Sequence, residues 1–306
     1  MTVECGAFNP AAEALLDRFL APVSLKEFVS TWWERQFLHV PGEKRKFDGL
    51  FDWPELNSLL NSHRFSPERF RLWRDGGFAD PSQYLRPSGL LGTAPVLDEV
   101  RKGATLVLAS VEEVSPRCRE MVDALQETFR CYSGAHAYVS FQAVPGFPTH
   151  FDNQGLLVTQ VAGRKYWRVW EPTFDHPLNE HQRQLPPPKD RSPYWEGTLE
   201  QGSLFHLPRG WWHEARSLGE PSLHLTLTVS AQTGVDLLRW AISELRRNEF
   251  FRRDVPRFTE SERHEYVNEL VRKLQAGLGD DAVERFLEES MTGVRPFPRF
   301  DFPSTD

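Results

Sequence analysis

Between residues 135 and 230 the hydrophobic pattern of this chain has a period of two. Short apolar or alternating segments recur there, separated by turn residues, at 136–143, 155–162, 166–170, 203–207 and 222–230. A period of two places successive side chains on opposite faces of a strand. Short strands at this spacing are typical of an antiparallel barrel or jelly roll. We therefore predict a mainly β fold with flanking helices and an antiparallel barrel or jelly-roll core.

The part of the chain before this β region is expected to be largely helical. Ser24, Asp52 and Ser115 each stand where a capping residue would begin a helix. Residues 76–103 are rich in Gly, Pro and Ser, which favour turns, so we expect an irregular loop there. A second long loop is expected at 172–200, a proline-rich and charged insertion between strands.

After the β region the hydrophobic period returns to 3.6. Helices are expected over 235–250, 260–276 and 280–289. We therefore expect two domains. Residues 1–234 would form the β domain with its N-terminal helices, and residues 235–306 a C-terminal helical region. The helices of this second region could pair two copies of the chain as a homodimer.

Composition and charge favour a cytoplasmic protein. A net charge of −7 provides no general attraction to nucleic acid or to an anionic membrane, so we predict neither as a direct partner. No apolar run approaches the roughly 20 residues that cross a bilayer, and the N-terminal Met1–Gly6 does not read as a signal peptide. Cys5, Cys118 and Cys131 are scattered and odd in number, which is typical of reduced thiols.

The pattern with the most chemical content is His150-Phe151-Asp152, followed later in the chain by His213. Residues i and i+2 of a strand point to one face, so His150 and Asp152 could reach one metal ion from one strand. Two imidazoles and one carboxylate suit a redox-capable divalent metal better than Mg²⁺ or Ca²⁺. Because a bare His-x-Asp recurs by chance, the spacing alone does not establish a metal site.

Longer segments around these residues resemble the JmjC/cupin-type 2-oxoglutarate oxygenases, and in particular their ribosomal-oxygenase-like branch. The resemblance lies in 134–138, 145–152, 160–169, 202–213 and 222–226, with 28–40 resembling the opening helix and strand of the family. It covers roughly residues 20–250 and implies a double-stranded β-helix (jelly-roll, cupin) core with a C-terminal helical region. The segments are specific in combination, whereas no single one of them is.

This resemblance implies a metal site and its cosubstrates. It implies that His150, Asp152 and His213 bind Fe(II), with 2-oxoglutarate and O₂ as cosubstrates. Such a triad holds iron on one face and leaves the other coordination positions open.

The resemblance also implies a pocket for 2-oxoglutarate. In the family a Lys or Arg at the place of Lys165 pairs with the 5-carboxylate, and the hydroxyls of Tyr138 and Thr226 match positions that help to hold it. A buried ammonium is costly without an anionic partner. The alternatives are a charged hairpin turn at Arg164-Lys165 and ordinary strand packing for Tyr138 and Thr226.

Three further histidines and one aromatic pair have no firm role at this point. His136 is interpreted as a hydrogen-bonded barrel histidine, and no role is assigned to His206 or His224. Trp211-Trp212 and the loop at 172–200 are candidates for a substrate groove, although packing is favoured for the two tryptophans.

The resemblance implies hydroxylation of an unactivated C–H, most commonly in an amino-acid side chain of a protein or peptide. Two alternatives stay open. One is N-methyl demethylation on the same iron site, and the other is a non-catalytic cupin-like module that binds a partner.

Overall fold

The computed structural model describes residues 8–188 and 190–292. They divide into two compact units. The first contains the described chain up to Phe129 and from Ser133 to Ser230, and the second contains Arg130–Tyr132 and the described residues from Ala231 onward. The domain boundary after residue 234 stays a prediction. Met1–Gly6, with Cys5, lies outside the described residues.

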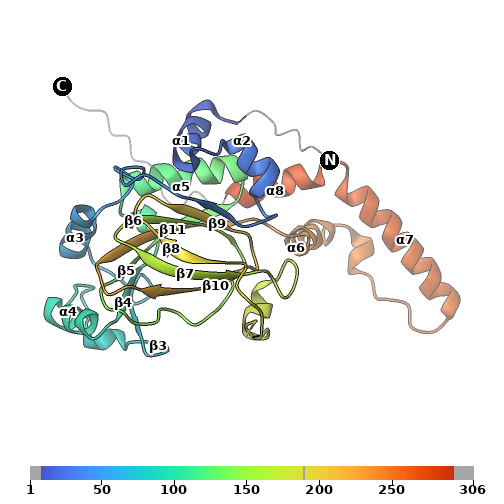
Figure 1. Cartoon of the computed structure of the whole chain (residues 1–306). Coiled ribbons are helices and arrows are strands. Elements are labelled where there is room, and N and C mark those ends of the chain that lie inside the picture. The colour runs from blue at the N-terminus through green and yellow to red at the C-terminus, as the bar shows by residue number, and fades with distance from the viewer. Residues whose placement is uncertain (1–7, 189, 293–306) are drawn as a thin grey trace, which may run out of the picture. The chain divides into compact units, whose positions relative to one another are not determined.

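Two antiparallel sheets form the first unit. Their strands are β1 (Leu38–Val40), β2 (Phe70–Arg74), β3 (Gly77–Phe78), β4 (Thr105–Leu108), β5 (Tyr132–Ser140), β6 (Gly155–Ala162), β7 (Lys165–Trp170), β8 (Trp195–Leu199), β9 (Leu204–Leu207), β10 (Trp212–Ser217) and β11 (Ser222–Ser230). The larger sheet has the order β1-β9-β6-β11-β5-β4-β2-β3 and the smaller one β10-β7-β8 (Figure 1). The predicted mainly β core is confirmed.

The apolar core lies between the two sheets. Every second side chain of a strand faces inward, and the inward set joins Leu156, Val158, Phe205 and Leu207 of the larger sheet to Trp167, Val169 and Leu199 of the smaller one. Trp211 belongs to this cluster, whereas Trp212 packs in a second cluster with Phe151 and Trp170. Packing is therefore the role of both tryptophans.

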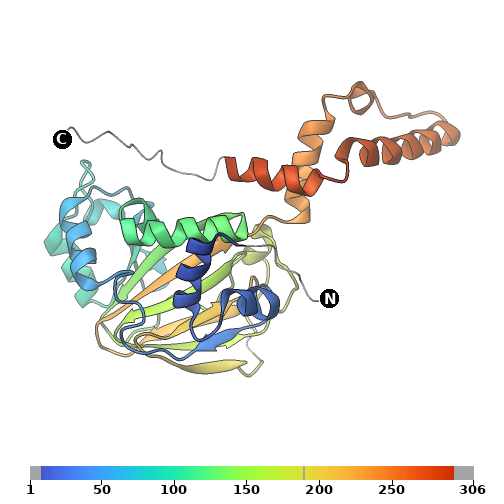
Figure 2. The ribbon, with the colours of Figure 1, turned by 90° about the horizontal axis from the view of Figure 1, so that it is seen from above.

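Helices cover the outer face of the larger sheet. These are α1 (Pro10–Leu20), α2 (Leu25–Glu27), which continues into a π-helical turn at Phe28–Trp32, and α5 (Pro116–Phe129) (Figure 2). Ser24 accepts the N–H of Glu27 and Asp52 accepts the N–H of Glu55, as capping residues do. Asp52 thereby begins α3 (Trp53–Ser62).

Two regions expected as loops contain regular elements. Residues 76–103 include α4 (Thr93–Arg101), which buries Val96 and Val100 one turn apart, so the Gly- and Pro-rich flanks concealed a short amphipathic helix. Residues 172–200 include β8, which pairs with β7 along its whole length. Cross-strand pairing stabilises β8 although its five residues include a glutamate and a central glycine, which are depleted in strands.

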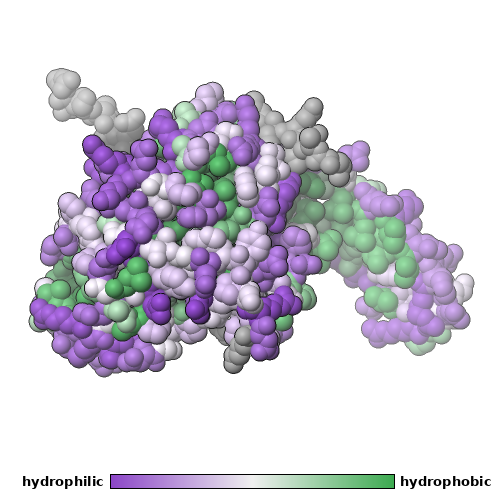
Figure 3. All heavy atoms as spheres, in the orientation of Figure 1, coloured by the Kyte–Doolittle hydropathy of each residue, from purple (hydrophilic) through white to green (hydrophobic). Residues whose placement is uncertain are grey.

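The second unit is helical, as expected. It contains α6 (Gly234–Leu245), α7 (Glu260–Leu278) and α8 (Ala282–Thr292). Thr233 and Thr259 begin α6 and α7 with reciprocal capping boxes. Exposed apolar side chains gather on this unit (Figure 3), among them Leu238, Ile242, Val267 and Val271. The tail from Arg295 lies outside the described residues.

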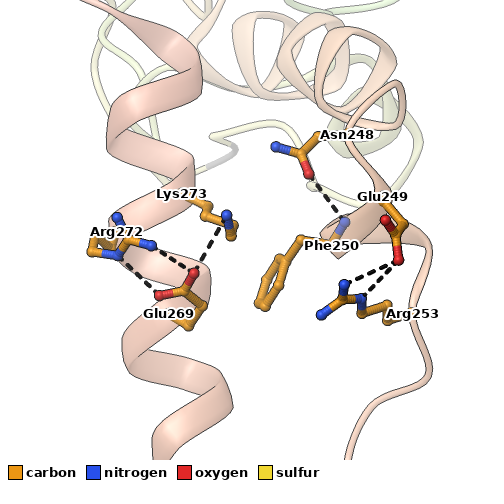
Figure 4. Close-up of polar contacts among 7 residues, drawn as sticks. All are labelled: Asn248, Glu249, Phe250, Arg253, Glu269, Arg272 and Lys273. Atoms are coloured by element: carbon orange, nitrogen blue, oxygen red, sulfur yellow. Dashed lines mark hydrogen bonds and ion pairs between the residues drawn. The ribbon is translucent and has the colours of Figure 1, made fainter.

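Local ion pairs lie in the connection between α6 and α7 and on α7 itself (Figure 4). Glu249 pairs with Arg253, and on α7 Glu269 pairs with both Arg272 and Lys273. Between them the ring of Phe250 stacks on Tyr266 at a centroid distance of 5.0 Å. Within residues 8–188 and 190–292, no helix has the length and hydrophobicity that a membrane span requires.

Candidate metal centre and its cavity

Two of the three candidate ligands are held side by side by the backbone. The N–H of His150 donates to the carbonyl of His213 (3.1 Å), and the N–H of His213 donates back (2.7 Å). His213 lies on β10, whereas His150 forms only this isolated bridge. Reciprocal bonds of this kind fix the spacing of the two side chains.

The expectation that His150 and Asp152 share one regular strand is wrong. Asp152 lies in the loop before β6, and its carbonyl accepts the N–H of Gly210 (2.9 Å), a residue of the turn before β10. The strand pairing between His150 and His213 therefore ends after one bridge. It does not extend on the other side of His150 either, because Pro148 has no backbone N–H to donate. The two side chains nevertheless lie close together.

The ligand atoms of His150, Asp152 and His213 all lie within 4.8 Å of one another. His213 Nε2 is 3.6 Å from Asp152 Oδ2, and the two imidazole centroids are 4.3 Å apart. Ligand bonds to such ions are about 2.0–2.2 Å long, so a single ion could draw the three atoms together. This donor set fits a non-haem Fe(II) site.

Backbone carbonyls orient both imidazoles. His150 Nδ1 donates to the carbonyl of Pro148 (2.8 Å), and His213 Nδ1 donates to that of Trp211 (3.2 Å). A carbonyl oxygen can only accept, so each Nδ1 carries the hydrogen and each Nε2 presents a lone pair. Burial, assisted by the nearby His150, lowers the pKa of His213 to about 4. A neutral imidazole is the form that binds a metal.

The long insertion at 172–200 packs behind the ligands. Gln182 Nε2 donates to the carbonyl of Phe151, the residue between two ligands (3.0 Å), and Thr173 Oγ1 accepts the indole N–H of Trp212 (3.0 Å). Leu185 packs against the second aromatic cluster. Sequence reasoning missed these contacts, because nothing in the insertion itself indicates which strand it will touch.

The three ligands line a cavity of about 120 Å³ that also reaches the other predicted site residues. Its wall contains Thr105, Tyr138, Gly146, Phe147, His150, Asp152, Leu156, Val158, Lys165, Trp167, His213, Ala215, His224 and Thr226. The six residues singled out in the sequence therefore lie in one place, although they come from four strands and a loop.

Lys165 is a buried ammonium group without an acid beside it. The residue is 3% exposed, and Nζ donates to Ser140 Oγ (3.1 Å). Burial lowers the pKa of Lys165 to about 7, and no carboxylate of the described chain offsets this effect. An anion entering the cavity would supply the missing partner.

Tyr138 and Thr226 lie near Lys165 on neighbouring strands. The ring of Tyr138 stacks on His224 with centroids 4.8 Å apart and planes 3° apart, and burial raises its pKa. Thr226 lies two residues after His224 on β11, so both face the cavity.

Three other strand histidines, which had no firm role in the sequence, differ in their surroundings. His136 accepts the N–H of Ser110 at Nδ1 (3.4 Å), and its burial lowers its pKa. His206 points to the outer face of the larger sheet, where it packs on Phe28 and Trp33. His224 lines the cavity. The sequence contained one usable signal for this difference. His224 and Thr226 are two residues apart, so on a strand their side chains point to the same face.

Comparisons with known proteins agree with this arrangement. Residues 108–237 match the model of the JmjC domain. The chain is 29% identical over 265 residues to ribosomal oxygenase 1 of Rattus norvegicus, covering 80% of this chain and 43% of that protein. It is 28% identical over 224 residues to the bifunctional lysine-specific demethylase and histidyl-hydroxylase NO66 of Caenorhabditis elegans, covering 70% of this chain and 29% of that one.

A solved structure shares the fold. The structure of YcfD, a ribosomal oxygenase from Escherichia coli, in complex with cobalt and 2-oxoglutarate superposes with a TM-score of 0.58 at 17% identity, covering 88% of this chain and 71% of that one. The chain spans less than half the length of the two curated relatives above. The domain match over residues 108–237, the relatives and the shared fold together confirm that the chain resembles the JmjC-type ribosomal oxygenases.

Proposed function

We propose that this protein is an Fe(II)- and 2-oxoglutarate-dependent oxygenase that hydroxylates an unactivated C–H in a side chain of a protein or peptide. The observation that carries the proposal is one cavity with a metal-ligand set at one end and an unneutralised lysine at the other. A ligand that chelates a metal and ends in a carboxylate fits both ends. Both curated relatives are named as oxygenase, demethylase or hydroxylase, which supports the same chemistry.

Each part of the cavity has a task in this proposal. Iron and 2-oxoglutarate, when bound, supply the oxidising chemistry with O₂. His150, Asp152 and His213 hold the metal in one orientation, and Lys165 neutralises the far carboxylate. Tyr138 and Thr226 offer hydroxyls to that carboxylate. The apolar wall formed by Phe147, Leu156, Val158 and Trp167 excludes water, which strengthens the electrostatic contacts inside.

A second cavity supports a polypeptide substrate. It has a volume of about 690 Å³ and shares Gly146, Phe147 and Ala215 with the wall of the metal cavity. A space of this size beside the iron could receive a residue together with its neighbours in a chain. None of the described residues of the insertion at 172–200 lines either cavity, so we assign the insertion to support of the ligands and not to the substrate.

The test is an anaerobic reconstitution with Fe(II) and 2-oxoglutarate, followed by addition of air. Succinate should form, and mass spectrometry of a peptide library should show products that are heavier by one oxygen atom. Release of formaldehyde would instead identify the demethylase alternative, which uses the same iron site. Absence of metal binding and of succinate would favour a non-catalytic binding module.

We further propose that the helical unit pairs two copies of the chain. On α6 the side chains of Leu238 and Ile242 are 59% and 66% exposed one turn apart, and on α7 Val267 and Val271 repeat this spacing. Exposing such an apolar stripe to water costs free energy, and this cost falls when the stripe packs against the same stripe of a second copy. Sedimentation velocity should show a dimer for the natural chain and a monomer for the double variant Leu238→Glu, Ile242→Glu. A natural chain that sediments as a monomer would refute the pairing.

A further inference from the structure

The inner end of the metal cavity contains an imidazole with one nitrogen that makes no hydrogen bond to the described residues. His224 lines the cavity together with Lys165 and is 3% exposed. Its Nδ1 is buried and has no hydrogen-bond partner in the part of the chain that the structure describes. Buried polar atoms are nearly always paired, so an unpaired one beside a cavity calls for an explanation.

His206 shows how a buried histidine is used for packing in the same sheet. Its Nδ1 donates to the carbonyl of Leu156 (3.0 Å), and its ring stacks on Trp33 with centroids 5.4 Å apart. Its Nε2 is also unpaired, but it faces helices and not the cavity. Packing alone therefore accounts for His206, whereas the position of His224 points to a ligand.

The ring of His224 is held in one plane by aromatic neighbours. Tyr138 stacks parallel to it, and Trp167 meets it edge-on with centroids 5.4 Å apart. The indole Nε1 of Trp167 likewise has no hydrogen-bond partner among the residues that the structure describes. Lys165 has three donors and uses one of them on Ser140. The inner end thus has more hydrogen-bond donors than acceptors. Asp152, the one acidic residue that the described chain contributes to the cavity wall, lies at the metal end.

We propose that His224 is a binding residue for the far carboxylate of 2-oxoglutarate, to which it donates a hydrogen bond beside Lys165. The proposal rests on the proposed function and deepens it. A carboxylate offers about four acceptor sites, so it can take bonds from both residues at once. Burial and the nearby Lys165 hold the pKa of His224 well below its usual range. The ring is therefore a neutral donor, which avoids a second cation next to Lys165.

The test measures binding of 2-oxoglutarate and not turnover. The Mn(II)-loaded protein is titrated with 2-oxoglutarate in a calorimeter without O₂. His224→Phe retains a ring that can stack on Tyr138 but has no N–H, and its Kd should be about 10-fold or more weaker. Mn(II) affinity should be unchanged. The matched control is His206→Phe, the same exchange outside the cavity, which should leave the Kd for 2-oxoglutarate unaltered.

A second measurement does not depend on a variant. In protein with ¹⁵N-labelled histidine and Zn(II) at the metal site, addition of 2-oxoglutarate should shift the ring nitrogen signals of His224 and leave those of His206 in place. If 2-oxoglutarate binds while the His224 signals stay fixed, or while His224→Phe binds equally well, this inference is wrong and the proposed function stands. If the natural protein binds no 2-oxoglutarate, both are wrong.

Discussion

The two ends of the cavity are built in opposite ways. At the metal end, His150 and His213 are paired through their backbones and through Nδ1, so their hydrogen bonds are satisfied before any ligand arrives. At the inner end, no anion of the described residues lies beside Lys165, and one nitrogen of His224 has no hydrogen-bond partner among them, although both side chains are almost fully buried. The metal end is therefore preorganised, whereas the inner end gives up stability until a ligand binds.

The largest effect is expected at the metal end. Asp152→Ala removes the only carboxylate that the described residues contribute to the cavity wall. Mn(II) affinity should fall at least about 100-fold and succinate formation should cease, because groups that only orient the ligands already change such affinities about 10–100-fold. Circular dichroism should show an unchanged fold. The control is Asp175→Ala, an exposed acid of the insertion, which should behave as the natural protein. Undiminished turnover in Asp152→Ala would disprove the assignment.

At the inner end, Lys165→Met should weaken binding of 2-oxoglutarate by about 100-fold, because a buried carboxylate would lose its charge partner. Mn(II) affinity should change little. Calorimetric titration of the Mn(II) form measures both. Arg164→Met is the matched control, since Arg164 is exposed and paired with Glu220. If Arg164→Met loses binding and Lys165→Met retains it, the anchor is the neighbouring arginine.

The same Lys165→Met variant should be more stable than the natural protein when no ligand is present. Burial lowers the pKa of Lys165 from 10.5 to about 7, so the charged form is disfavoured in the folded state. The resulting penalty is fully present below pH 7 and disappears as the pH rises to 10.5. The gain should be about 2–5 kcal/mol at pH 7.

Thermal melting at several pH values measures this gain. The difference in Tm between variant and natural protein should shrink between pH 7 and pH 9.5. Saturating 2-oxoglutarate should raise the Tm of the natural protein alone. A variant that is less stable than the natural protein at pH 7 would show that the lysine contributes to packing more than its burial costs.

The smallest effect is expected behind the metal ligands. Gln182→Ala removes the donor to the carbonyl of Phe151 and should weaken Mn(II) binding up to about 10-fold, the low end of the range for groups that orient ligands. Gln184→Ala, an exposed neighbour in the same insertion, is the control. Equal Mn(II) affinities for the two variants would mean that the contact from the insertion does not strengthen metal binding.

The sequence predicted more of the strands than of the connections between them. Period-two alternation located β5, β6, β7, β9 and β11, because inward and outward side chains differ in polarity there. It missed α4 and β8, where glycine and proline flank short elements that only their neighbours stabilise. The hydrophobic pattern of a segment indicates which of its own side chains are buried. It does not predict a strand or helix that forms only because another segment pairs or packs with it.

Sequence by itself brought out His150, Asp152, His213, Lys165, Tyr138 and Thr226 as candidates, because their residue types and spacing match a known chemistry. Tertiary structure alone decided that Gln182 supports the ligand segment. It also placed His224 at the cavity, which the spacing to Thr226 in the sequence only indicated. The reason is physical: a side chain's chemistry is local, whereas its burial and its partners depend on strands and loops that are distant in the chain.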